Sequence, residues 1–147
     1  MNKSYRKGYA FERRVVSQLS RLGYFVVRQG KSAFPDIIAF PTINTWSATI
    51  VGESAIKDCI VIRKPGDPVG DYYTLYSYKP AKDDVLFIEC KTRAKIPANP
   101  IKMLSKEEVE KLENIYLTIS NAVCLLAFPA KIKRTSYIQY YDLFDAI

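Results

Sequence analysis

The sequence predicts an α/β (α+β) domain in which a central mixed β-sheet is flanked by helices. Three features carry this prediction: an amphipathic helical pattern near the start, apolar strand-like runs that follow it, and a capped second helix among further runs of this kind. Helices and strands that alternate along a chain pack as layers around one core. The chain has 147 residues, 48% of them hydrophobic, so we assign residues 1–147 to a single domain.

Residues 5–22 are predicted to form the first helix. Apolar side chains from Phe11 to Leu22 recur at the spacing of one helical face, and Gly23 is placed to end the helix. Glu12 is the only acid in this helix and lies beside the apolar stripe, so it borders the buried side. Taken alone, Glu12 is more simply interpreted as the partner of a neighbouring basic residue in an ion pair.

Two strands are expected to follow, at residues 24–28 and 35–40, with a polar loop between them. Pro35 opens the second strand, where a missing amide matters least. Asp36 is therefore expected at the start of a strand, beside a loop.

Residues 41–84 have a different character from the strands on either side. Short strand-like runs at 49–51, 59–63 and 72–78 are separated by turn signals, the strongest of them at 64–71. We interpret this segment as an inserted β-hairpin region, an excursion from the core sheet.

The apolar run at residues 85–91 predicts a buried strand with polar chemistry at its end. Side chains alternate along a strand, so Glu89 and Lys91 share one face. An unpaired carboxylate or ammonium is costly to bury, so an acid and a base that emerge together are paired, exposed or bound to a ligand. For the pair alone, an edge salt bridge is the simplest interpretation.

A second helix and two more strands complete the expected fold. Ser105 and Glu108 have the spacing of a capping box, and the helix is expected to run to about residue 120. Apolar runs at 122–128 and 137–141 predict the two strands.

The composition limits both partners and chemistry. The formal charge of +7 favours a polyanionic partner such as nucleic acid or an anionic membrane surface. No apolar run has the length of a membrane span or the form of a signal peptide, so we expect a soluble, cytoplasmic (intracellular) protein with no membrane partner. Cys59, Cys90 and Cys124 are far apart in apolar surroundings, which indicates buried free thiols.

The chain contains no histidine. This excludes a Ser-His or Cys-His nucleophile pair, a histidine-ligated zinc site and a histidine general base. Hydrolytic chemistry would then depend on carboxylates, lysine and a hard metal ion.

Asp36 and Glu89 are the candidate metal ligands. If their strands are neighbours, the two carboxylates lie close together and repel each other unless a cation neutralises them. Oxygen ligands favour Mg²⁺ over zinc, and Mn²⁺ can substitute. Lys91 would orient a water or stabilise charge developing on a phosphate, and Glu12 would hold a metal-bound water. This set fits a metal-dependent phosphodiesterase.

The order of these residues resembles the PD-(D/E)xK nucleases and, within them, the archaeal Holliday junction resolvases, including those of archaeal viruses. The resemblance covers residues 5–40 and 84–128 and implies a restriction-endonuclease-like core. Its motifs are Arg6-Lys7-Gly8 with Glu12-Arg13, the run at 23–28, Ser32 before Pro35-Asp36, and Ile88-Glu89-Cys90-Lys91. The segment 41–84 departs from the family, which has only a short hairpin there.

The resemblance implies a homodimeric, metal-dependent endodeoxyribonuclease that resolves four-way DNA junctions by paired symmetric nicks. A two-fold dimer would place one active site at each of the two equivalent strands of a junction. Asp36 and Glu89 would bind Mg²⁺ together with the backbone carbonyl of Cys90, Glu12 would be an outer acid, and Lys91 would be the catalytic lysine.

The residues expected to contact or position DNA are Ser32 and a set of basic side chains. Ser32 is also placed in the catalytic set. The basic residues are Arg6, Lys7, Arg13, Arg28, Lys31, Arg93 and Lys95.

Two alternatives remain open from the sequence. One is a nuclease of the same fold that acts on linear, nicked or flapped DNA. The other is a nuclease-fold protein that only binds DNA, although such a protein has no need of Asp36, Glu89 and Lys91 together.

Overall fold

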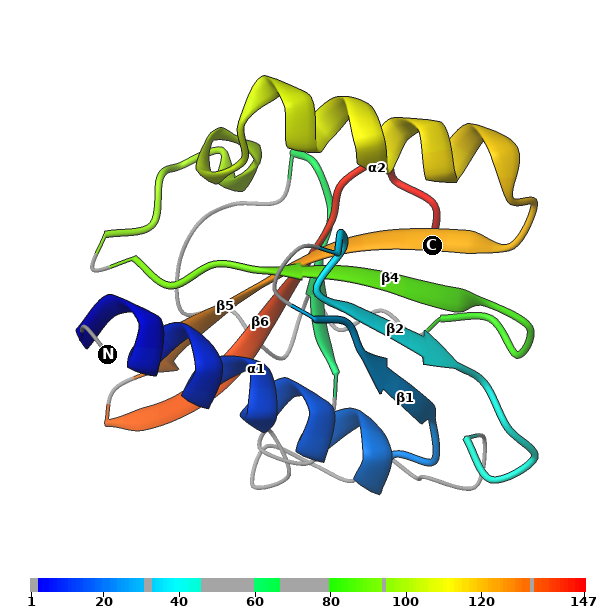
Figure 1. Ribbon diagram of the computed structural model, residues 1–147, viewed down its shortest axis with the longest axis horizontal. Helices are drawn as coiled ribbons and strands as arrows, with labels where there is room; N and C mark the ends of the chain where they lie inside the picture. The colour runs from blue at the N-terminus through cyan, green and yellow to red at the C-terminus, as the bar shows by residue number, and fades with distance from the viewer. Residues whose placement is uncertain (1–2, 31–32, 46–59, 67–79, 94, 133) are drawn as a thin grey trace.

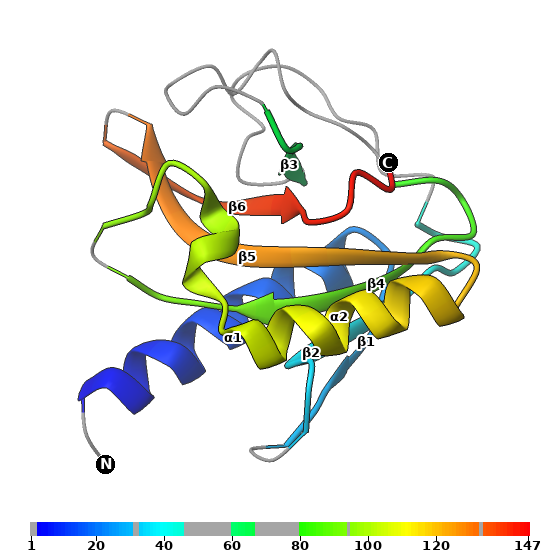
Figure 2. The same ribbon diagram turned by 90° about the horizontal axis from the view of Figure 1, so that it is seen from above.

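The computed structural model describes residues 3–30, 33–45, 60–66, 80–93, 95–132 and 134–147. These residues form a mixed α+β fold in which a six-stranded mixed sheet lies between two helices (Figures 1 and 2). The predicted central mixed sheet with flanking helices is confirmed. The strands expected at residues 49–51 and 72–78 lie outside the described residues.

The helices and strands follow the predicted order, with small differences at their ends. β5 and β6 are longer than their apolar runs predicted, because they pair with each other along a hairpin. The described elements are α1 (Lys3–Arg21), β1 (Phe25–Arg28), β2 (Ile37–Phe40), β3 (Val61–Arg63), β4 (Val85–Cys90), the 3₁₀ helix η2 (Pro100–Met103), α2 (Lys106–Thr118), β5 (Ala122–Ile132) and β6 (Thr135–Asp142).

The strand order in the sheet is β1-β2-β4-β5-β6-β3. β1, β2 and β4 are antiparallel neighbours, β4 and β5 are parallel, and α2 makes the crossover between them. β5 and β6 are antiparallel. The pairing of β2 with β4 brings together the two strands that carry the candidate metal ligands.

β3 corrects the interpretation of residues 41–84 as an excursion from the sheet. It joins the sheet as an edge strand and pairs in parallel with β6, from Val61 opposite Gln139 to Arg63 opposite Tyr141. Ile60 and Ile62 are buried in the core beside it. At least this part of the segment is therefore structural, because removing it would expose one edge of the sheet and part of the core.

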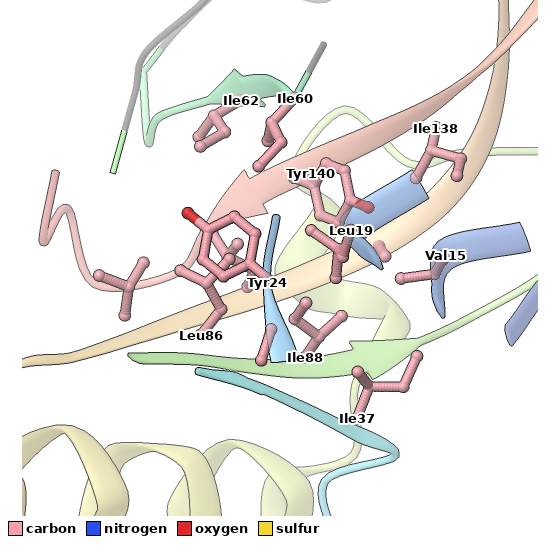
Figure 3. Close-up of a cluster of buried hydrophobic side chains, with 14 of the residues drawn as sticks. Val15, Leu19, Tyr24, Ile37, Ile60, Ile62, Leu86, Ile88, Ile138 and Tyr140 are labelled. Atoms are coloured by element: carbon pink, nitrogen blue, oxygen red, sulfur yellow. The ribbon is translucent and has the colours of Figure 1, made fainter. Parts of the chain in front are cut away.

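The first core layer lies between α1 and the sheet (Figure 3). Val15 and Leu19 of α1 are fully buried against Ile37 of β2 and Ile88 of β4. The predicted apolar stripe of the helix is therefore the stripe that packs on the sheet. It fixes α1, and Glu12 with it, over the β2–β4 part of the sheet.

α2 covers the face of the sheet opposite α1 (Figure 1), and the second core layer lies between α2 and that face. Leu112 of α2 is fully buried there, and Phe87 of β4 packs in the same layer. Leu86 and Ile88 belong to the first layer. Because side chains alternate along β4, Glu89 faces the α2 side.

The predicted capping box at the start of α2 is confirmed. Ser105 Oγ accepts a hydrogen bond from the Glu108 amide at 3.1 Å, and Glu108 Oε1 accepts one from the Ser105 amide at 2.9 Å. This reciprocal pair fixes the first turn of α2, and with it the position of the Glu108 carboxylate.

Gly23 ends α1 in a conformation that other residues rarely adopt, with φ at 93°. A Cβ at this position would lie 2.7 Å from the carbonyl carbon of Asn44 and the amide nitrogen of Thr45. A side chain here would therefore meet the backbone that follows β2.

Neither described helix has the length and apolar character needed to cross a membrane. Cys90 and Cys124 are free thiols, as predicted, but only Cys124 is buried and Cys90 is half-buried. Cys59 lies outside the described residues.

Candidate active site

Asp36 and Glu89 meet where β2 and β4 stop pairing. The last register pair toward this end joins Ile37 with Ile88. Beyond it, side chains take the place of the backbone ladder: the Asp36 amide donates to Glu89 Oε1 at 3.2 Å, and the Cys90 amide donates to Asp36 Oδ2 at 2.9 Å. Each carboxylate is thus held by a backbone amide of the other strand.

Glu89 is the most deeply buried acid of this group, with 5% of its surface exposed. Burial raises the pKa of Glu89 far above its ordinary value, hydrogen bonding with Asp36 and Glu108 raises it further, and the nearby Lys91 charge opposes the rise. Carboxylates packed this closely require a shared proton or a cation between them.

Lys91 lies on the same side as Glu89, as the alternation of the strand predicted. Its Nζ is 2.9 Å from Glu108 Oε2 and 3.8 Å from Glu89 Oε2. The ammonium is half-buried, with 28% of the side chain exposed. It is therefore held in place beside Glu89, although solvent still reaches it.

Glu108 is the site residue that sequence reasoning missed. It was predicted only as a capping residue, yet its second carboxylate oxygen accepts the hydrogen bond from Lys91. Burial alone would raise its pKa, but hydrogen bonds with Glu89, the Ser105 amide and Lys91 outweigh this effect and lower the pKa to about 2. The sequence feature that could have indicated this role is the capping box, because it fixes an acid at the start of α2, the helix that follows β4 and Lys91.

Glu12 approaches from α1 on the other side of Asp36. Burial raises the pKa of Glu12, the Asp36 charge raises it further, and Arg28 opposes both effects. Arg28 Nε donates to Glu12 Oε2 at 2.8 Å, and its guanidinium lies 4.6 Å from the centre of the Tyr9 ring. The ion-pair partner of Glu12 is therefore on β1, not on its own helix.

An open cavity of about 310 Å³ leads to Asp36 from the side of α1. Both α1 and the β1–β2 connection contribute to its wall. The lining residues are Gly8, Tyr9, Glu12, Arg28, Gln29, Gly30 and Asp36.

Cys90 contributes to this region through its backbone and not through its thiol. Its side chain packs against the first core layer, on the side of the sheet away from Glu89. Burial raises the pKa of this thiol well above its ordinary value, and the Asp36 charge adds to the rise. A neutral, buried thiol is a poor metal ligand, so the predicted role of Cys90 is limited to its carbonyl.

Three further basic residues that were predicted to contact DNA are described by the structure, and all three are exposed. Arg13 is exposed and its guanidinium lies 5.8 Å from the Tyr9 ring centre. Arg93 donates to the Met103 carbonyl of η2 at 3.4 Å, and Lys95 is exposed.

The remaining predicted site residues lie wholly or in their side chains outside the described part of the protein. Lys31 and Ser32 lie outside the described residues. Arg6 and Lys7 belong to α1, but their side chains also lie outside what is described.

The oxygen donors at Asp36 and Glu89 fit Mg²⁺, although the protein supplies only a few of them. Within the described part of the chain, no group of three or more His, Cys, Asp or Glu side chains could hold a metal ion. Mg²⁺ is usually held by one or two carboxylates and keeps several waters, with substrate phosphates completing its shell. Two carboxylates and a backbone carbonyl therefore suit Mg²⁺ better than an ion that needs an all-protein cage.

Comparisons of the chain with protein-family models, with curated proteins and with solved structures found no match.

Proposed function

We propose that the protein is a metal-dependent endodeoxyribonuclease of the PD-(D/E)xK type, with a restriction-endonuclease-like core, that resolves four-way DNA junctions by paired nicks. One observation carries the proposal. Asp36 and Glu89 are in contact at the open end of the β2–β4 pair, and Lys91 Nζ lies 3.8 Å from Glu89. Two acids and a lysine held in this way, without histidine, suit phosphodiester hydrolysis with a hard metal ion.

Asp36, Glu89 and the Cys90 carbonyl would hold Mg²⁺. The chemistry that Mg²⁺ supplies when bound is stabilisation of charge on the scissile phosphate and activation of a water at neutral pH. Asp36 is suited to this role because Oδ2 accepts from the Cys90 amide, which fixes the orientation of the carboxylate.

Lys91 would act on the phosphate through its ammonium group. Glu108 accepts a hydrogen bond from Lys91 Nζ, and this contact limits the positions that the long side chain can take. An ammonium has three donors, so Lys91 can keep this contact and still donate to a phosphate oxygen or to the attacking water. Glu12 would hold a water on the opposite side of Asp36.

DNA is the favoured substrate because the chain is strongly basic and because Arg28 and Lys91 lie beside acids of the site. Arg28 and Arg13 lie on the α1 side of the site, within reach of the same Tyr9 ring. Their guanidinium groups would bind phosphates beside the scissile bond. Action on a four-way junction and formation of a homodimer follow from the resemblance to the resolvases.

The test is cleavage of a synthetic four-way junction, a linear duplex and a flap of equal length, each with Mg²⁺ and with EDTA. We expect paired symmetric nicks in the junction, only with Mg²⁺, and none with Asp36→Asn, which should still bind the junction. Cleavage of the duplex or flap alone would support the same chemistry on another substrate. Binding without cleavage of any substrate would contradict the nuclease proposal and favour a DNA-binding protein.

A further inference from the structure

A second open cavity, of about 490 Å³, lies between α1 and the β5–β6 hairpin. α1 and the start of β6 form its walls, and the tip of the hairpin forms one rim. The lining residues are Arg14, Ser17, Gln18, Arg21, Arg134, Ser136, Tyr137 and Ile138. We call this the arginine cavity.

The chemistry of the arginine cavity favours an anion. Three arginines line it, Arg14 and Arg21 on α1 and Arg134 at the hairpin tip, and none of the eight lining residues that the structure describes is acidic. The hydroxyls of Ser17 and Ser136 add donors between them. Arginine presents several donors in a fixed planar arrangement that matches the oxygens of a phosphate.

The arginine cavity is separate from the carboxylate site. With about 100° of rotation per residue, Arg14 lies about 200° and Arg21 about 180° around α1 from Glu12. They therefore project from the opposite flank of the helix, whose diameter is about 10–12 Å. A phosphate bound by Arg14 and Arg21 cannot be the one held beside Asp36.

The size of the arginine cavity fits a stretch of polynucleotide better than a single phosphate. Arg14 and Arg21 are about 10 Å apart along the helix axis, at about 1.5 Å per residue. This equals the axial rise of about three nucleotides of one DNA strand, at about 3.4 Å each. Arg134, on the β5–β6 hairpin, lines the cavity from the side opposite these two arginines of α1.

We infer that the arginine cavity binds the phosphate backbone of a second DNA segment, on the flank of α1 opposite the segment that is cleaved. The inference rests on the proposed function, because it takes DNA as the substrate. For a branched DNA, it assigns one segment to the carboxylate site and a separate segment to the arginine cavity, with α1 between them.

The test is the salt dependence of junction binding in EDTA, measured by fluorescence anisotropy. The affinity for DNA falls as salt rises, and each phosphate contact that is lost makes the slope of log K against log salt shallower by about one. A lower slope means a shallower one. We therefore expect Arg134→Ala to lower the slope by about one and Arg14→Ala/Arg134→Ala by about two, with about a tenfold loss of affinity for each arginine. Lys82→Ala, an exposed residue in the turn before β4, removes the same charge elsewhere and should leave the slope unchanged.

Unchanged slopes in both arginine variants, or an equal fall in Lys82→Ala, would overturn the inference. A cavity that takes free anions would give a different result, in which inorganic pyrophosphate raises the melting temperature of the wild type only and the DNA slopes stay the same. That result would also overturn it. Mg²⁺-dependent cleavage by the wild type distinguishes the two failures, because it persists if only the second DNA site is wrong and is absent if the protein is not a nuclease.

Discussion

Two strands of the sheet, β4 and β6, each carry a buried acid at or next to their last residue, but the two acids have different surroundings. Glu89 of β4 is 5% exposed and Asp142 of β6 is 0% exposed. Burial raises the pKa of both side chains. Burial and pKa alone therefore do not separate a functional acid from a structural one.

The partners of the two acids do separate them. Asp142 accepts hydrogen bonds from the amides of Ala146 at 3.1 Å and Ile147 at 2.9 Å, so its oxygens are satisfied by the chain that follows it. Glu89 instead lies against the carboxylates of Asp36 and Glu108, with Lys91 as its basic neighbour. An acid that faces other acids is unfavourable unless a cation or a proton joins them, and the proposed Mg²⁺ would be such a cation.

The largest expected effect is on cleavage. Glu89→Gln and Asp36→Asn should each lower the rate of junction cleavage by about 10³-fold or more, because each removes an oxygen that holds the metal ion. Asp142→Ala should leave the rate within about twofold of the wild type, since it lies at the end of another strand. Single-turnover cleavage with saturating enzyme measures all three, and an equal loss in Asp142→Ala would remove the distinction between the two acids.

Lys91→Met should lower cleavage by about 10²–10³-fold while junction affinity in EDTA stays close to that of the wild type. The substitution keeps the length of the side chain and removes the charge that acts on the phosphate. Lys111→Met on α2, where the lysine pairs with Glu107 at 3.4 Å, is the matched control and should retain activity. Comparable losses in both variants would show that a general loss of charge is responsible.

Glu89→Gln, which should lose activity, should gain stability, and Asp142→Ala, which should keep activity, should lose stability. In EDTA at neutral pH, Glu89→Gln should raise the free energy of unfolding by about 1–3 kcal/mol, or about 3–10 °C in Tm, because it removes a carboxylate that is costly to bury. Asp142→Ala should lower it by about 1–2 kcal/mol, because two amides lose their acceptor. Thermal melts followed by circular dichroism measure both changes, and a less stable Glu89→Gln would contradict this account of the site.

The pH dependence of the Glu89→Gln effect has a defined sign. The folded-state pKa of Glu89 is raised above its ordinary value of 4.5. Protonated Glu89 therefore contributes fully to the stability of the folded state below pH 4.5, and this contribution declines as the pH rises toward the folded-state pKa. The lowered pKa of Glu108 acts at pH values below 4.5, so it leaves this range unaffected. The advantage of Glu89→Gln in Tm should grow from pH 5 to pH 8, and a constant difference would show that Glu89 does not titrate in this way.

The smallest expected effect is at Glu108. Glu108→Gln keeps an oxygen for the Ser105 amide but replaces the charge–charge contact with Lys91 by a neutral one. We expect about a tenfold loss of cleavage, with a shift in the pH profile of the rate, since the side chain positions Lys91 without touching the phosphate. Glu107→Gln, one residue earlier on α2, is the control and should change neither the rate nor the profile.

Local patterns predicted much of the fold and part of the site. The apolar stripe of α1, the capping box of α2 and the alternation along β4 are set by residues close in the sequence, and each is confirmed. The proximity of Asp36 and Glu89 was predicted only if their strands were neighbours, and the pairing of β2 with β4 meets that condition.

Contacts between distant parts of the chain were not predictable in this way. The pairing of β3 with β6 depends on which sheet edge is available, and the apolar run at residues 59–63 fits an edge strand as well as a separate hairpin. The contact of Arg28 with Glu12 and that of Glu108 with Lys91 also join separate elements. The periodicity of the sequence does not predict contacts between side chains of separate elements, because tertiary packing decides which of them meet.

The most direct test of the central claim, that Asp36 and Glu89 form a divalent-cation site, is a titration of Tm with Mg²⁺ at pH 8. A ligand that binds only the folded state stabilises it in proportion to the logarithm of its concentration above Kd. The account predicts that Mg²⁺ raises the Tm of the wild type and of Asp142→Ala in parallel and leaves the Tm of Glu89→Gln and Asp36→Asn unchanged. An equal rise in all four proteins would place the cation elsewhere and contradict the assignment of these carboxylates.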